Sequence, residues 1–211
     1  MTEQVRNPMF ARIYARMMEG EDPQQAEYRR ELLAGLSGRV FELGAGTGAN
    51  FSHYPPSVTQ VVAAEPESYL RERALAAAAE APVPVEVVDA VADDLPFEDE
   101  SFDAAVVCLV LCTVPDQARA LAEVHRIVRR SGELRFYEHV HAHRQPMRAL
   151  LELADRSTLW PRLAGGCHVT RDTVPAIERA GLTVERVRRF PYSPARLAPP
   201  LPHVIGVARR P

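Results

Sequence analysis

The amino-acid sequence predicts a doubly wound α/β fold, in which helices cover both faces of a mostly parallel sheet. From residue 40 onward, short apolar segments alternate with helical patterns, which is typical of parallel strands joined by right-handed crossovers. A glycine-rich turn follows the first apolar segment, at the position where open α/β sheets bind their ligands. Both observations favour a sheet with a binding crevice at its carboxyl edge.

The elements follow from this alternation. Strands are expected at residues 40–43, 61–64, 83–88, 103–108, 133–140, 182–190 and 204–208. Helices are expected at residues 8–36, 49–53, 67–80, 116–130 and 172–180. In the fourth of these helices, an apolar stripe for packing on a sheet is formed by Leu121, Val124, Ile127 and Val128. A proline-rich connection without room for a helix joins the last two strands, so we expect them to be antiparallel.

The composition is that of a single globular domain. Of 211 residues, 46% are hydrophobic and 25% are charged, which is the ordinary range for soluble proteins. The longest apolar stretch, residues 104–112, is far shorter than the ~20 residues of a membrane-spanning helix. The amino terminus has no apolar segment typical of a secretory signal. We therefore expect a cytoplasmic protein that does not bind membranes.

The cysteines and the charges exclude further classes. Three cysteines are too few for a disulfide framework. A zinc site of Cys108, Cys112, Cys167 and His168 would require the first two to leave an apolar strand region, so no metal is expected. Residues 1–140 hold 13 Arg against 23 acidic residues, and residues 141–211 hold 12 against 5. The basic part lacks interleaved aromatic residues, so nucleic acid is not an expected partner.

The strongest local signal is the segment from Val40 to Asn50, which reads as a strand, a glycine-rich turn and a helix start. It also fits the dinucleotide pattern G-x-G-x-x-G/A, which is weak alone. A third glycine at position 48 favours a different ligand, as does Glu42, because a carboxylate beside the loop suits an ammonium group better than a pyrophosphate. Glu65 ends the next strand, where a carboxylate can accept hydrogen bonds from a ribose diol.

The loop from Glu42 to Gly48, the acid Glu65 and the segment 95–103 resemble the class I S-adenosylmethionine-dependent methyltransferases. The resemblance implies a Rossmann-like, seven-stranded, mostly parallel sheet with an antiparallel last strand. It implies S-adenosylmethionine as cofactor, held by Tyr14, Glu42, Gly44, Ala45, Gly46, Gly48, Asn50, Glu65, Pro66, Ala92, Asp93 and Leu109. Many members have Asp where this chain has Val91, so either Asp93 or Asp89 is expected to contact the adenine amino group.

A closer resemblance extends along most of the chain, to the methyltransferase type 11 branch with its bacterial small-molecule enzymes and mammalian thiol methyltransferases. It is carried by segments 50–51, 54–55, 109–114, 138–140, 160, 166–167, 170–173 and 202–206. The mammalian members begin with a hydrophobic anchor, and this sequence has none. The resemblance implies a soluble relative that methylates a small thiol, with O-, N- or C-methylation or non-catalytic cofactor binding as alternatives. Nucleic-acid methylation ranks third.

The resemblance divides the single domain, residues 1–211, into a helical lid (1–36), a cofactor-binding core (38–140), a helical insert with a final helix (141–181) and a C-terminal strand pair (182–211). His139, which ends the fifth strand, is the candidate catalytic residue, as a base or as a donor that stabilises a thiolate. His141 and His143 are expected to be solvated. Candidate substrate-binding residues are Phe10, Tyr14, His139, Trp160, Cys167 and His168. Phe10 and Tyr14 lie one helical turn apart and could close over the donor.

Overall fold

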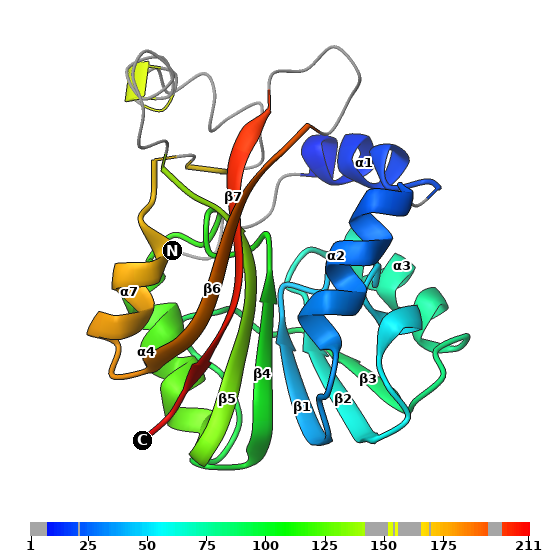
Figure 1. Ribbon diagram of the computed structural model, residues 1–211. Helices are drawn as coiled ribbons and strands as arrows, with labels where there is room; N and C mark the ends of the chain where they lie inside the picture. The colour runs from blue at the N-terminus through cyan, green and yellow to red at the C-terminus, as the bar shows by residue number, and fades with distance from the viewer. Residues whose placement is uncertain are drawn as a thin grey trace.

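The computed structural model describes residues 8–20, 22–141, 152–153, 155, 166–168, 170–193 and 200–211, within which seven strands form a single sheet. The strands are β1 (Gly38–Leu43), β2 (Val58–Ala64), β3 (Val85–Val88), β4 (Phe102–Cys108), β5 (Val128–His139), β6 (Thr183–Tyr192) and β7 (Leu201–Arg209). The helices are α1 (Pro8–Met17), α2 (Pro23–Leu33), the 3-10 helix η2 (Phe51–His53), α3 (Ser68–Ala78), α4 (Gln117–Ile127) and α7 (Thr173–Arg179) (Figure 1).

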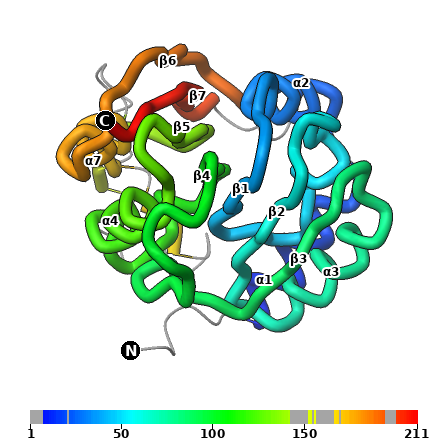
Figure 2. Tube along the Cα trace, turned by 90° about the horizontal axis from the view of Figure 1, so that it is seen from below, coloured from blue at the N-terminus to red at the C-terminus, as the bar shows by residue number. Residues whose placement is uncertain are grey.

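The strand order is β3-β2-β1-β4-β5-β7-β6. Strand β7 runs antiparallel to β5 and β6 on its two sides, and all other neighbouring pairs are parallel. The predicted mostly parallel sheet with an antiparallel last strand is therefore confirmed. Helices α2 and α3 lie on one side of the sheet, and α4 and α7 lie on the other (Figure 2). The chain leaves β1 toward β2 and β3 and then returns to β4, so the strand order switches between β1 and β4. In open α/β sheets, ligands bind at the carboxyl ends of the strands beside such a switch.

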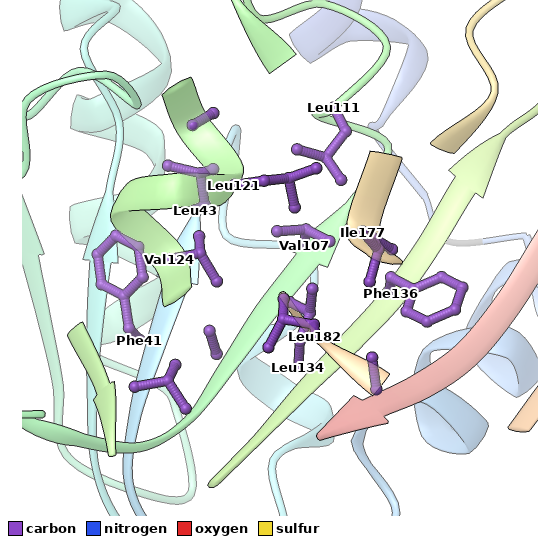
Figure 3. Close-up of a cluster of buried hydrophobic side chains, with 14 of the residues drawn as sticks. Phe41, Leu43, Val107, Leu111, Leu121, Val124, Leu134, Phe136, Ile177 and Leu182 are labelled. Carbon is purple, nitrogen blue, oxygen red and sulfur yellow. The ribbon is translucent and has the colours of Figure 1, made fainter. Parts of the chain in front are cut away.

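Each face of the sheet has its own apolar core, because successive side chains of a strand point to opposite faces. Along β1, Phe41 and Leu43 join the cluster under α4 and α7, and Val40 joins the cluster under α2 and α3. The predicted stripe of α4 packs here, with Leu121 and Val124 directed at the strand residues (Figure 3). These two cores hold the carboxyl ends of β1, β4 and β5 in fixed relative positions.

The N-terminal segment differs from the single helical stretch expected at 8–36. It forms two helices, α1 and α2, because the signals between them start a new helix. Gly20 has a φ of 88°. The side chain of Asp22 then accepts a hydrogen bond from the Gln24 amide, and Pro23 occupies the first turn of α2. The predicted helix 116–130 also ends earlier, at Ile127, because Val128 already begins β5. Among the described residues, no helix is long and apolar enough to cross a membrane.

Candidate active site

The glycine loop connects β1 to η2 and lies against the segment that follows β4. Gly44 has a φ of 70°, and a Cβ atom there would lie 2.3 Å from Cγ2 of Val110. Gly48 has a φ of 80°, and a Cβ atom there would lie 2.8 Å from the Phe51 ring. Both positions therefore require glycine for the conformation and for the space. The loop backbone is held close to the carboxyl ends of β1 and β4.

Glu65 follows β2 and links this loop to α3. Its carboxylate accepts hydrogen bonds from the amides of Gly46 (2.8 Å) and Glu67 (2.9 Å). The residue is buried, and desolvation raises the pKa of this carboxyl to about 7. Each carboxylate oxygen has a second lone pair, so Glu65 can accept further hydrogen bonds from a ligand at the loop.

Glu42 lies beneath the loop in β1, and its carboxylate is held by protein groups. It accepts hydrogen bonds from Nδ2 of Asn50 (2.8 Å) and from the hydroxyl of Tyr54 (2.6 Å). Oδ1 of Asn50 in turn accepts one from Nη1 of Arg29 (2.6 Å). Only 1% of Glu42 is exposed, and desolvation raises its pKa to about 7. The predicted pair Glu42 and Asn50 thus belongs to one buried network that fixes the start of η2.

Glu138 in β5 is a third buried acid at this edge, next to the candidate base His139, and no role of its own was predicted for it from the sequence. Its Oε1 accepts hydrogen bonds from the amides of Val110 and Leu111, both at 2.9 Å, and its buried Oε2 has no hydrogen-bond partner among the described residues. Desolvation raises the pKa of Glu138 to about 7. Leu109, just before these amides, has a φ of 57°, which is strained for a residue with a side chain. The sequence signal for its burial is its position in β5, directly after the buried residues Phe136 and Tyr137.

The three acids Glu42, Glu65 and Glu138 stand at the carboxyl ends of β1, β2 and β5. Uncompensated buried carboxylates are costly. A ligand that brings positive charge to this edge would stabilise their ionised forms, so the arrangement favours a cationic ligand over an anionic one.

Helix α1 lies over the glycine loop, as expected for a lid. The rings of Phe10 and Tyr14 stack with their centroids 5.8 Å apart. The Tyr14 ring lies 3.4 Å from where a Cβ atom of Gly46 would stand. Burial raises the pKa of Tyr14 to about 12, so its hydroxyl stays neutral. Tyr14 therefore lies against the glycine loop, in a small cluster separate from the two main cores, and Phe10 stacks on it.

The expected adenine end of the site lies after β3. The ion pair of Asp93 with Arg119 has an N–O distance of 3.8 Å, and Ala92 packs against the core under α4. Asp89 is held by Arg71 at 3.0 Å, and the same guanidinium donates to the carbonyl oxygen of Pro66. Asp93, with its longer ion-pair distance, is the acid less firmly engaged by the protein.

His139 ends β5 between two thiols. Its Nδ1 lies 3.9 Å from the sulfur of Cys112 and 3.9 Å from that of Cys167. The contact with Cys112 and the imidazole of His139 lower the pKa of the Cys167 thiol. The ring of the buried His203 lies next to that of His139, with the two centroids 4.3 Å apart. Burial lowers the pKa of His203 to about 3. The sequence placed Cys167 near the acceptor, but it did not pair Cys112 with His139.

Of the remaining predicted substrate residues, one lies beside Cys167 and one lies outside the described residues. His168 lies beside Cys167, its amide donates to the carbonyl oxygen of Cys112 (2.8 Å), and its Nδ1 lies 3.2 Å from Asp155. Trp160 and His143 lie outside the described residues. His141 was expected to be solvated, whereas its Nε2 lies 3.4 Å from a carboxylate oxygen of Glu152. Cys108, which the sequence considered as a zinc ligand, points elsewhere, 3.5 Å from Nη1 of Arg29.

Comparison with known proteins identifies the family. The methyltransferase domain family matches residues 41–136. Thiol S-methyltransferase TMT1B of Mus musculus is 36% identical over 182 residues, which cover 83% of this chain and 73% of the mouse protein. Thiol S-methyltransferase TMT1A of Homo sapiens is 33% identical over 196 residues, covering 88% of this chain and 79% of the human protein.

A solved structure agrees on the fold. Geranyl diphosphate C-methyltransferase of Streptomyces coelicolor, in complex with S-adenosyl-L-homocysteine, superposes with a TM-score of 0.67 at 14% identity, covering 89% of this chain and 77% of that one. The glycine loop, the acid after β2 and the extended sequence identity all indicate the same family. The chain therefore belongs to the class I S-adenosylmethionine-dependent methyltransferases and is an enzyme of that family.

Proposed function

We propose that the enzyme transfers the methyl group of S-adenosylmethionine to the sulfur of a small thiol. The observation that carries this proposal is the extent of the identity with the thiol S-methyltransferases. The 182 aligned residues are far more than the matched methyltransferase domain of residues 41–136, so the similarity extends into the regions that flank the cofactor core. Acceptor specificity is expected in those flanking regions.

The residues at the carboxyl edge fit S-adenosylmethionine, which supplies a methyl carbon made electrophilic by a sulfonium. We assign the amides and glycines of residues 44–48 to its methionine part and Glu65 to the ribose hydroxyls, which is supported by the tight packing of the loop and by the bond from the Gly46 amide to Glu65. Ala92 and Asp93 are assigned to the adenine, and Leu109 to the side of the cofactor next to the loop. The unpartnered oxygen of Glu138 supports this fit, because a buried carboxylate favours a cation.

Acceptor activation needs little help if the nucleophile is a thiol. A thiol with a pKa of about 8.5 is already a few per cent ionised at neutral pH. In-line attack then depends on positioning, which supplies up to about 7–11 kcal/mol in well-oriented reactions. We assign the orientation of the acceptor sulfur to His139, either as proton acceptor or as a group that stabilises the thiolate, and only the second role is compatible with a metal bound to its Nδ1. Phe10, Trp160, Cys167 and His168 are candidate pocket residues.

The test is an acceptor panel. The purified protein is incubated with S-adenosylmethionine and matched aliphatic thiols, phenols and amines, and release of S-adenosylhomocysteine is followed together with the mass of the methylated product. We expect turnover with thiols at rates at least about 10-fold above those with the oxygen and nitrogen analogues, because the thiolate is the better nucleophile. Turnover confined to phenols or amines would overturn the thiol assignment, and donor binding without turnover on any acceptor would overturn catalysis.

The lid makes a separate prediction. Replacing Tyr14 by alanine is expected to raise the KM for S-adenosylmethionine about 10-fold, because a cation–π contact in a desolvated site contributes about 1–2 kcal/mol. Tyr14→Phe keeps the ring and is expected to change the KM little. Met9, which is 68% exposed on the same helix, provides the control variant Met9→Ala. Equal KM values for Tyr14→Ala and Met9→Ala would show that the ring does not cover the donor.

A further inference from the structure

The described residues contain one group of side chains with the donor atoms of a metal site, and it lies beside the proposed acceptor position. The sulfurs of Cys112 and Cys167 and a ring nitrogen of His139 all lie within 4.8 Å of one another. They come from three separate segments: the loop after β4, the end of β5 and the segment 166–168. Both cysteines are buried, and the imidazole is half-buried.

The backbone around this group is fixed by hydrogen bonds that do not involve the three side chains. The His168 amide donates to the carbonyl oxygen of Cys112 at 2.8 Å. Nη1 of Arg171 donates to the carbonyl oxygens of Leu111 (2.6 Å) and Val114 (2.7 Å). The two cysteine-bearing segments are therefore held next to each other by backbone contacts as well as by the contact between their thiols.

Hydrogen bonds engage these atoms only pairwise. The Cys112 thiol donates to the carbonyl oxygen of Leu109 (3.6 Å), and Nδ1 of His139 faces both sulfurs at 3.9 Å, although one ring nitrogen forms a hydrogen bond with only one of them at a time. A single cation would engage all three atoms. With Zn–S bonds of about 2.3 Å and Zn–N bonds of about 2.0–2.1 Å, a tetrahedral site has S–N separations of about 3.6 Å and S–S separations of about 3.8 Å. The two S–N separations, both 3.9 Å, are a few tenths of an ångström larger, and the S–S separation is at most 4.8 Å, so small side-chain rotations can close the differences.

We propose that Cys112, His139 and Cys167 bind a thiophilic divalent cation, Zn²⁺, and that its fourth coordination position takes the thiol of the acceptor. On binding, each cysteine loses its proton to solvent and the imidazole uses the neutral Nδ1 lone pair. The two thiolates then neutralise the 2+ charge, so the buried site carries no net charge. Among the described residues, no fourth His, Cys, Asp or Glu joins the group. Three protein ligands with an open fourth position are typical of catalytic zinc sites.

The location gives the metal a role in methyl transfer; this part of the inference depends on the proposed function. The Cys112 sulfur lies 3.6 Å from the carbonyl oxygen of Leu109, and Val110 packs against Gly44 of the cofactor loop. The incoming thiol R–SH loses its proton to solvent and binds as the thiolate. Its sulfur lone pair forms the new bond to the methyl carbon while the bond from that carbon to the sulfonium breaks. The neutral thioether is a weaker ligand than the thiolate and leaves.

The first test measures metal content in the full chain, purified without chelators or affinity tags after growth with added zinc. We expect about one equivalent of zinc per chain, and less than a tenth of that in Cys112→Ser and Cys167→Ser. Cys108→Ser is the matched control, because Cys108 lies near Arg29 and outside the group. It should keep its zinc. Zinc absent from the wild type, or retained in both ligand variants, would overturn the site, as would an intact mass showing a Cys112–Cys167 disulfide in the freshly purified protein.

The second test separates the metal site from the methyl transfer. The protein reconstituted with Co²⁺ should show sulfur-to-cobalt charge-transfer absorption and the intense visible bands of tetrahedral cobalt. Mercaptoethanol added without S-adenosylmethionine should shift these bands, and ethylene glycol, its oxygen analogue, should not. Unchanged bands would overturn the thiol at the fourth position. A shift without any turnover would support the metal site while refuting the proposed function, and full turnover in zinc-free protein would refute the metal's role in an enzyme whose function stands.

Discussion

Replacing Glu65 by alanine is expected to raise the KM for S-adenosylmethionine about 100-fold or more, with a much smaller change in kcat. The carboxylate already orders the loop through the Gly46 amide, and its remaining lone pairs can accept the ribose hydroxyl hydrogen bonds that we propose. Hydrogen bonds to a charged group contribute about 1.5–3 kcal/mol each. Two lost ribose contacts therefore amount to at least about 3 kcal/mol, which is about 100-fold in affinity. Steady-state kinetics and calorimetric titration of the donor measure this change.

The neighbouring acid Glu67 provides the matched control. Glu65 and Glu67 are both 6% exposed, but the Glu67 side chain accepts a hydrogen bond from the Leu70 amide and caps α3. Glu67→Ala should cost stability, about 1 kcal/mol for a lost cap, and should leave the KM for the donor within a few-fold. If the alanine variant of Glu65 folds poorly, Glu65→Gln gives the same comparison with the side-chain volume kept. Equal effects of the Glu65 and Glu67 variants on donor affinity would show that Glu65 only supports the loop.

Local patterns were sufficient to predict the sheet, because each strand and helix leaves a periodic signal in its own residues. The glycines and Glu65 were also predictable, since a strand, a tight turn and an acid at the next strand end are linked through short stretches of sequence. The break between α1 and α2 was missed because the apolar residues on its two sides were assigned to one helix, although residues 19–25 contain no apolar spacing. Asp22 and Pro23 carry the signal that should have divided the segment.

Contacts between distant loops were not predictable in this way. The group of Cys112, His139 and Cys167 depends on the positive φ of Leu109, which turns the chain after β4, and on the bond from the His168 amide to the Cys112 carbonyl oxygen. Neither feature has a local signature. The zinc site considered and rejected from the sequence combined Cys112 and Cys167 with Cys108 and His168 instead of His139, because spacing alone cannot tell which of these side chains meet. The network of Glu42 could not be predicted for the same reason, since Tyr54 bonds to it directly and Arg29 through Asn50, from separate segments.

Replacing Glu42 by glutamine is expected to stabilise the ligand-free protein by up to about 3 kcal/mol at pH 8 and by much less near pH 4.5. Burial raises the pKa of this carboxyl from its ordinary value of 4.5 to about 7. Between these values the folded chain holds a proton that the unfolded chain has lost. The free energy of unfolding therefore falls as pH rises through this window, by about 1.4 kcal/mol per pH unit for one carboxyl. Above pH 7 the loss is complete, and glutamine, which carries no charge, avoids it.

Comparing the two proteins at each pH isolates Glu42, because the other titrating groups are common to both. Glu65 and Glu138 also have raised pKa values, and the lowered pKa of His203 acts in the opposite direction, but these contributions cancel in the difference. Urea unfolding at pH 4.5, 6 and 8 gives the free energies. A difference that does not change with pH would mean that Arg29, through Asn50, keeps Glu42 ionised throughout. If the difference in the free energy of unfolding grows by about 3 kcal/mol from pH 4.5 to pH 8, the buried charge of Glu42 destabilises the ligand-free protein. This is what we expect of a site whose donor brings a positive charge.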